Sequence, residues 1–251
     1  GVGASGALVP RVPIDLRASV MLHACPVTEH HVVFLASDDV LDAMAYASGG
    51  TMMRWAPENG TRVGVLPRRG TADDIRWIDV ENHYVTHYFN AWEADGVIEV
   101  HAPRSDRTPD VFGADDTVEP NRGPLPWRWV IDPAAGTVHD EQIDDRRGEF
   151  PRVNDDHAMR PTRYLYNCLP HPGGPDLEFD GVVKYDLATG ASTEFRYGAH
   201  EVSGEHAFAP DPDGTAEDDG WLLGFVAERG TGRTDLCVLD ARDVTAGPVA
   251  R

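Results

Sequence analysis

The sequence predicts an all-β chain organised as a β-propeller, and three observations lead to this prediction. Short runs of Val, Ile, Phe, Tyr and Trp alternate with polar residues and end at Gly, Asn, Asp or Pro, as β-strands do. With 25 Gly and 19 Pro among its 251 residues, the chain is rich in turns, which disfavours a helical bundle. Hairpin-like segments also recur at a constant spacing, which is typical of propeller blades.

The strand pattern appears along the whole chain and is interrupted by one helical segment. Residues 38–47 are expected to form a short helix, with Ser37 as its cap and three apolar side chains, Val40, Leu41 and Met44, on one face. The predicted strands are, in order, 31–35, 62–66, 84–89, 97–101, 128–131, 182–185, 222–226 and 236–239.

Asp132, Asp186 and Asp240 carry the repeat, because each follows a strand pattern and 54 residues separate neighbours (186 − 132 and 240 − 186). A Gly four residues after the first two tolerates a positive φ, as a hairpin turn requires. Two Gly-Glu pairs end in Glu149 and Glu205, at nearly the same phase of successive repeats. In a propeller this phase predicts two carboxylates that point toward one axis. Coincidence is the alternative, since such hairpins are common.

Composition excludes several classes of protein. The formal net charge of −20 disfavours nucleic-acid binding, because an acidic surface repels phosphate. The acidic stretch 106–119 is expected to be a solvated loop. No run of 18 apolar residues is present, so no transmembrane segment is predicted, and the start of the chain lacks the features of a signal peptide. Three distant cysteines favour neither a disulfide framework nor a thiolate zinc site, and indicate a reducing, cytoplasmic compartment.

Most of the eleven histidines need no special role. His139 begins an H-x-E pattern with Glu141, which could start an iron site of two histidines and one carboxylate. Charged neighbours make an exposed hairpin the stronger interpretation there. Four others lie near turns or strand ends and are expected to be solvated: His30, His31, His101 and His171.

His23 and His87 differ from the rest because they stand among apolar residues of predicted strands. An inward imidazole needs partners for both ring nitrogens, and a core histidine satisfied by hydrogen bonds is the alternative to a metal ligand. The steps from His23 to His87, to Glu149 and to Glu205 are 64, 62 and 56 residues (87 − 23, 149 − 87 and 205 − 149). This spacing favours one inward polar group per repeat.

Six segments, taken in order, resemble the motifs of the carotenoid cleavage oxygenases, a family that includes the lignostilbene dioxygenases. His87-Tyr88-Phe89-Asn90-Ala91-Trp92-Glu93 resembles the family motif H-x-x-N-A-[WY]-E, for example. The other segments are Met21-Leu22-His23 with Thr28-Glu29 and Val32-Val33-Phe34, then 57–68, 148–154, Gly204-Glu205 and 216–223.

This resemblance implies a seven-bladed β-propeller with Fe²⁺ on its axis, held by four histidines and, behind them, three glutamates. His23 and His87 match the second and third metal ligands, and Glu149 and Glu205 match two of the supporting glutamates. The first ligand is expected before Gly1 and the fourth beyond Arg251. Residues 1–251 are therefore expected to form a partial propeller domain, lacking N-terminal blades and the extreme C-terminus.

The implied activity is oxidative cleavage of a C=C bond by O₂, which gives two carbonyl products. The expected substrate is an apolar polyene, such as a carotenoid or apocarotenoid, or a stilbene. A glutamate that accepts the outer N–H of a ligating histidine fixes its orientation, and we expect Glu149 to do this for His87 and Glu205 for the fourth histidine. Peripheral membrane contact suits such substrates. Aromatic candidates for the substrate tunnel are Phe89, Trp92, Trp127 and Phe150.

Three positions depart from the family pattern: Ala24 replaces an Asp, Cys25 a Phe, and His206 a Pro. Ala24 removes a carboxylate close to His23, although no proposed ligand is lost. Three alternatives stay open. The chain could be a catalytically inactive fragment with two of the four ligands, a propeller binding module with polar core residues, or a different metal enzyme that uses His139 and Glu141.

Overall fold

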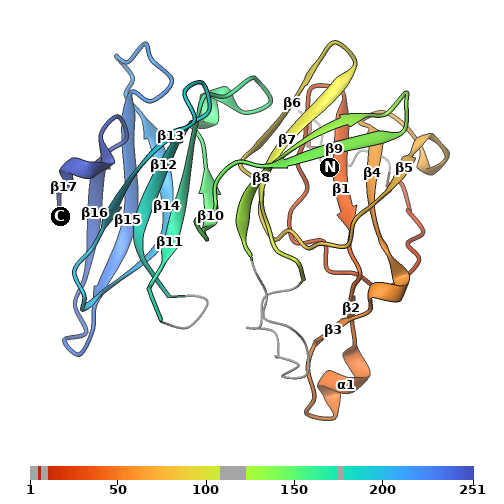
Figure 1. The fold of residues 1–251 in the computed structure, drawn as a ribbon, viewed down its shortest axis with the longest axis horizontal. Helices are drawn as coiled ribbons and strands as arrows, with labels where there is room; N and C mark the ends of the chain where they lie inside the picture. The colour runs from red at the N-terminus through yellow and green to blue at the C-terminus, as the bar shows by residue number, and fades with distance from the viewer. Residues whose placement is uncertain (1–4, 7–10, 108–122, 174–177) are drawn as a thin grey trace.

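The computed structural model describes residues 5–6, 11–107, 123–173 and 178–251. These residues form four successive antiparallel units and a separate β2–β3 hairpin, which confirms the all-β prediction (Figure 1). The first unit has the strand order β1-β4-β5 and the second β6-β7-β8-β9, while β10 to β13 and β14 to β17 form the third and fourth. One pairing, Phe179 with Ser203, joins the last two units.

The bounds of the strands are as follows. They are β1 His31–Ala36, β2 Asp39–Leu41, β3 Met53–Trp55, β4 Thr61–Pro67, β5 Arg76–Val80, β6 Asn90–Ala94, β7 Val97–Arg104, β8 Leu125–Asp132, β9 Thr137–Gln142, β10 Glu149–Arg152, β11 Tyr164–Pro170, β12 Phe179–Asp186, β13 Ala191–Arg196, β14 Glu201–Pro210, β15 Gly220–Glu228, β16 Thr234–Asp240 and β17 Pro248–Ala250. The described helices are α1 Ala43–Ala47 and the 3₁₀ turns Pro57–Asn59, Ala72–Asp74, Asp155–His157 and Val244–Ala246.

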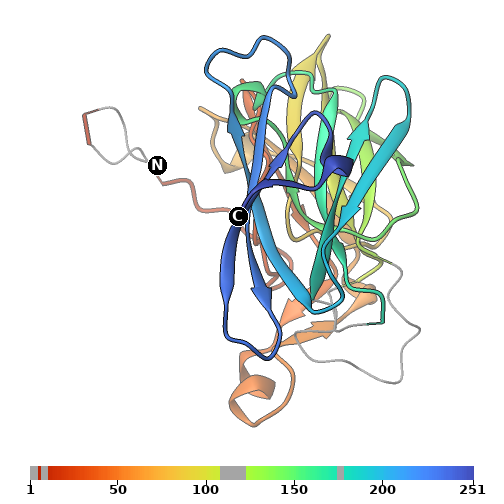
Figure 2. The same cartoon turned by 90° about the vertical axis from the view of Figure 1, so that its left-hand side faces the viewer.

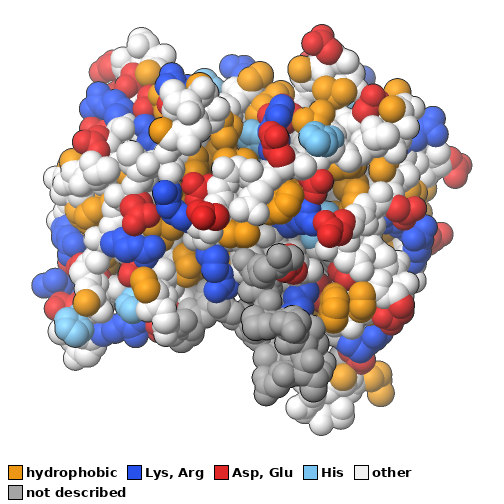
Figure 3. All heavy atoms as spheres, in the orientation of Figure 1, with side chains coloured by type: hydrophobic (Ala, Val, Ile, Leu, Met, Phe, Trp, Pro, Cys, Tyr) orange, Lys and Arg blue, Asp and Glu red, His pale blue; other side chains and the backbone are white. Residues whose placement is uncertain are grey.

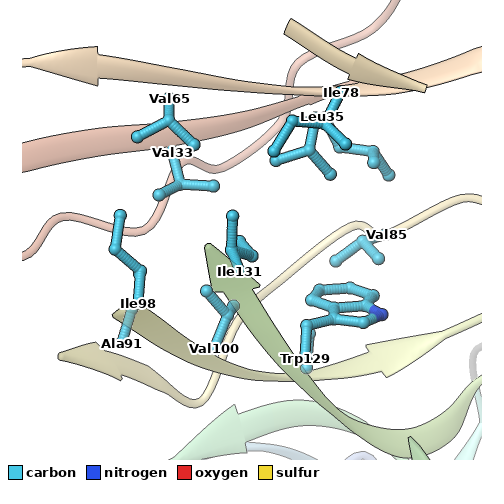
Figure 4. Close-up of a cluster of buried hydrophobic side chains, with 12 residues drawn as sticks. Val33, Leu35, Val65, Ile78, Val85, Ala91, Ile98, Val100, Trp129 and Ile131 are labelled. Atoms are coloured by element: carbon cyan, nitrogen blue, oxygen red, sulfur yellow. The ribbon is translucent and has the colours of Figure 1, made fainter. Parts of the chain in front are cut away.

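Apolar clusters fill the space between neighbouring units. In Figure 4, Val33 and Val65 of the first unit face Ile98, Val100 and Ile131 of the second. Burial of such side chains is the main stabilising contribution to a β-fold, and it requires the sheets to pack face to face. The first and second units therefore pack against each other as separate sheets, whereas the third and fourth are joined in one sheet through β12 and β14.

Two further clusters continue this packing. Phe89, which precedes β6, packs with Leu165 and Val183 of the third unit. Val182 of the third unit packs with Leu222 and Leu239 of the fourth. Strand β10 lies between the two halves of the molecule (Figure 1), where it contacts both β7 and β14. Residues at the start of β10 are therefore close to elements from three units.

The predicted repeat is present as structure. Asp132, Asp186 and Asp240 are the last residues of β8, β12 and β16. Each carboxylate accepts a backbone N–H from two residues further on, at 2.9, 3.1 and 2.9 Å. Gly136 and Gly190 both have φ of 71°, as the hairpin turns of the first two copies require. The 54-residue spacing therefore marks equivalent hairpin strands in successive units.

The predicted helix 38–47 is wrong in its first half. Asp39–Leu41 pairs with Met53–Trp55, and α1 begins only at Ala43. The cap is Asp42 rather than Ser37, because the Asp42 side chain accepts the Ala45 N–H at 2.8 Å. The hairpin and α1 extend away from the sheets in both views (Figures 1 and 2). Met44 is consequently 81% exposed instead of contributing to an apolar face.

Charged side chains of both signs are interspersed over the face shown in Figure 3. The acidic stretch that was expected to be a loop lies outside the described residues, apart from Asp106 and Arg107. Within the described part of the chain, no helix has the length and apolar character that a membrane span needs.

Candidate functional site

His87 lies in an irregular arch before β6, and not in the strand predicted for 84–89. Tyr84 exchanges two backbone hydrogen bonds with Ser105 of the neighbouring chain segment, and the Phe89 N–H donates to the His101 carbonyl. Between the Tyr84–Ser105 and Asn90–His101 pairs, residues 85–89 face the shorter segment 102–104, which also contains Pro103 and so lacks one donor. The ladder is therefore interrupted, and the surplus residues form the arch that carries His87.

His23 lies beside His87 although 64 residues separate them in sequence (87 − 23). Their ring centroids are 4.7 Å apart and the ring planes meet at 82°. His23 belongs to an extended segment without regular strand pairing, held at its two ends by bridges from Val20 to Val40 and from Val27 to Val32. The structure thus brings together the two histidines that the sequence singled out, but on irregular segments.

Glu149 holds the His87 ring from the opposite side. Its Oε2 lies 2.8 Å from His87 Nδ1, and the same oxygen accepts the backbone N–H of Phe150. Burial tends to lower the pKa of His87, but the hydrogen bond and the charge of Glu149, with the charge of Glu205, raise this pKa above its usual value. Because Nδ1 is engaged by the carboxylate, Nε2 is the His87 nitrogen that remains for another partner.

Phe150 forms an apolar wall next to this pair. Its backbone has φ of 55°, a left-handed conformation that is costly for an aromatic residue. The ring lies 5.6 Å from His87 and 5.0 Å from Phe179, measured between centroids. Of the aromatic side chains predicted to line a tunnel, Phe150 is in ring contact with His87, whereas Phe89 and Trp92 are buried within the sheets.

Glu205 lies on β14 and forms an ion pair with Arg152 of β10. The Arg152 Nε–H also donates to the His206 carbonyl at 2.8 Å. Glu149 and Glu205 are thus on the first strands of consecutive units, as the Gly-Glu spacing predicts, and Arg152 links those strands. Arg152 lies within the 148–154 motif, and its position three residues after Glu149 is the signal in the sequence that points to it.

The contact between His23 and His87 provides a set of donors whose fit to a metal ion can be examined. Two adjacent imidazoles, one oriented by a carboxylate, are a donor set that suits a divalent transition metal such as iron. In the described ranges, no group of three or more His, Cys, Asp or Glu side chains gathers closely enough to hold a metal ion. The donor set therefore fits such a metal but comprises two histidines.

Other histidines do not join this site. His139 is exposed on β9, and Glu141 binds Arg128 at 2.9 Å instead. His101, which was expected to be solvated, is 1% exposed, and its Nε2 lies 3.0 Å from Glu99. That prediction is wrong because His101 lies in the buried part of β7 and packs against Trp92, with ring centroids 5.0 Å apart.

The chain is similar in sequence to proteins that are named as oxygenases. It is 33% identical over 240 residues to the apocarotenoid-15,15'-oxygenase of Synechocystis, covering 91% of this chain and 48% of that protein. It is 29% identical over 248 residues to resveratrol cleavage oxygenase 1 of Aspergillus fumigatus, covering 90% of this chain and 50% of that protein. The chain thus spans about half the length of these relatives.

The chain belongs to the RPE65 family, described as retinal pigment epithelial membrane protein, which it matches over residues 2–251. The crystal structure of a cobalt-substituted Synechocystis apocarotenoid oxygenase has the same fold, with a TM-score of 0.78 and 31% identity over 91% of this chain and 49% of that one. The family that the motifs implied is thereby confirmed, and so is an all-β fold that matches the solved structure of a relative.

Proposed function

We propose that this chain is part of a seven-bladed propeller oxygenase that uses Fe²⁺ to cleave a C=C bond. The observation that carries the proposal is the contact between His23 and His87, with Glu149 bonded to His87 Nδ1. In this proposal the two histidines hold the metal together with two further histidines outside the chain. Residues 1–251 then constitute a partial propeller domain.

Ferrous iron bound at this place supplies the activation of O₂. The chain's own residues prepare the site for it. Glu149 keeps the proton of His87 on Nδ1, so that Nε2 faces the metal as a neutral ligand. Glu205 is assigned the same role toward the fourth histidine. Phe150 and Phe179 exclude water from one side and present flat apolar surface, which suits a conjugated substrate.

The proposed substrate is a carotenoid, an apocarotenoid or a stilbene, cleaved with O₂ to two carbonyl products. The names of the relatives support this range, because one acts on an apocarotenoid and another on resveratrol. Nucleic acid is not a proposed partner of this acidic chain. A cytoplasmic location with peripheral membrane contact belongs to the proposal, since polyenes partition into membranes.

Metal analysis of the full gene product tests the proposal. We expect close to one iron per chain, lost in His87→Ala and in His23→Ala but kept in the control His139→Ala, because His139 is exposed and remote from the pair. Iron-loaded protein should convert an apocarotenoid or a hydroxystilbene to aldehydes only when O₂ is supplied. Absence of iron from the full product, or equal loss in all three variants, contradicts the proposal; bound iron without turnover favours an inactive protein.

A further inference from the structure

Three buried side chains, His206, Tyr197 and Cys168, contact one another next to Glu205 of β14. His206 follows Glu205 on this strand and is 2% exposed. Tyr197, which follows β13, places its hydroxyl oxygen 2.9 Å from His206 Nε2, and its ring stacks on the imidazole at 18°. Cys168 of β11 places Sγ 3.4 Å from His206 Nδ1. The imidazole is therefore held at both nitrogens.

The hydrogen bonds in this group can be assigned with His206 as the Nδ1–H tautomer. The Cys168 thiol donates to the Gly204 carbonyl at 3.6 Å, so its sulfur is free to accept the His206 Nδ1–H. His206 Nε2 then accepts the Tyr197 hydroxyl proton. Burial lowers the pKa of His206 to about 4, which keeps the ring neutral as this arrangement requires. All three side chains are satisfied without solvent.

Gly224 leaves the space that this imidazole fills. Gly224 lies opposite His206 in the β14–β15 pairing, and a Cβ on it would lie 2.6 Å from two atoms of the ring. The carotenoid oxygenase pattern has Pro where this chain has His206, and a proline could accept neither contact. His206 thus brings Cys168 and Tyr197 into one network.

The network holds the two residues that flank Glu205. Cys168 binds the carbonyl of Gly204, and the imidazole anchors His206, while Arg152 contacts the His206 carbonyl and the Glu205 carboxylate from the other side. The pairing register shifts within this stretch, between Ser203 and His206, so the ladder alone does not fix its conformation.

We propose that His206, held by Tyr197 and Cys168, is a positioning residue for Glu205. By fixing the irregular backbone on both sides of Glu205, it sets where that carboxylate lies relative to Arg152 and to the His87–Glu149 pair. The functional part of this inference rests on the proposed metal site. The positional part does not, because it concerns contacts within the metal-free chain.

The test compares three variants of the full gene product. His206→Ala removes the network, and Tyr197→Phe removes one hydroxyl while keeping the ring. Tyr166→Phe is the matched control, because Tyr166 is also buried in this sheet and its hydroxyl donates to the Ala241 carbonyl at 3.0 Å, away from Glu205. Two signals are read: the NMR resonance of the Arg152 Nε–H without metal, and the absorption bands and affinity of added Co²⁺.

We expect the Arg152 signal to shift or to exchange away in His206→Ala, and less strongly in Tyr197→Phe. Co²⁺ affinity should fall about tenfold in His206→Ala, as for a disturbed supporting carboxylate, with displaced bands. Tyr166→Phe should change neither. If His206→Ala and Tyr197→Phe lower stability but leave the Arg152 signal and the Co²⁺ bands unchanged, the proposal is overturned. If the parent binds no Co²⁺, the metal function fails, and the Arg152 signal alone decides the positional inference.

Discussion

Replacing Glu149 with Gln tests the best-defined contact of the candidate site. Glu149 is buried, and its carboxylate accepts from His87 Nδ1 and from the Phe150 N–H. Glutamine has the same size and keeps one acceptor oxygen, but it is neutral. The substitution therefore removes the negative charge while leaving the packing of β10 in place.

The structure allows two magnitudes to be assigned. A hydrogen bond to a charged group contributes about 1.5–3 kcal/mol and a neutral one about 1 kcal/mol, so the free energy of unfolding should fall by about 1 kcal/mol in Glu149→Gln. Loss of the carboxylate behind a ligating histidine typically weakens metal binding about 10- to 100-fold. The loss of metal affinity should therefore exceed what a loss of about 1 kcal/mol in the free energy of unfolding would explain.

The assay is titration with Co²⁺ beside urea unfolding, with Glu99→Gln as the control. Glu99 bonds His101 Nε2 at 3.0 Å, and its side chain is 20% exposed against 11% for Glu149. Both variants should lose stability, but only Glu149→Gln should lose Co²⁺ affinity. Equal effects of the two variants on Co²⁺ binding, or none from Glu149→Gln, would refute the reasoning.

Other predictions concern stability, measured by urea unfolding. Desolvation holds the pKa of His206 at about 4 in the folded chain, against 6.5 in the unfolded chain. The contribution of the neutral ring to the free energy of unfolding is therefore complete above pH 6.5 and declines as the pH falls toward 4. His206→Ala should flatten this decline. Gly224→Ala should cost about 1–3 kcal/mol because its Cβ meets the imidazole at 2.6 Å, whereas Gly204→Ala, whose nearest neighbour is 3.7 Å away, should be tolerated. Leu239→Ala should cost about 2–5 kcal/mol since Leu239 is fully buried, while Leu236→Ala, at 45% exposed, should cost little, and equal losses would contradict the assigned core.

Much of the fold was predictable because strand periodicity is a local signal. The strand expected at 97–101 lies within Val97–Arg104, and the one expected at 236–239 within Thr234–Asp240. The equal steps between Asp132, Asp186 and Asp240 also reflect local contacts, since each carboxylate accepts a hydrogen bond within its own turn. Such features depend on neighbours in sequence, and sequence reasoning found them.

The errors arise where tertiary pairing overrides the local pattern. Val40 and Leu41 suit a helix, but Met53–Trp55 offers them a β partner, and Asp42 then caps the remaining turn. The apolar alternation around His87 suits a strand, yet the surplus residues opposite Pro103 prevent regular pairing. Neither competing partner is visible within a short window of sequence.

The sequence pointed to the histidines and glutamates of the candidate site, but not to the buried side chains that pack around them. Motif spacing identified His87 and Glu149, which the structure brings within 2.8 Å. The contacts of His206 with Cys168 and Tyr197 join three segments of chain. The substitution of Pro by His206 was the available signal, and its meaning required the fold.

The left-handed backbone of Phe150 places opposing demands on one position. Glycine would adopt φ of 55° without penalty, so Phe150→Gly relieves the conformational cost and also removes the ring that faces His87. The same substitution, however, removes the packing of the ring against Phe179, which is buried, so the loss of packing opposes the conformational gain.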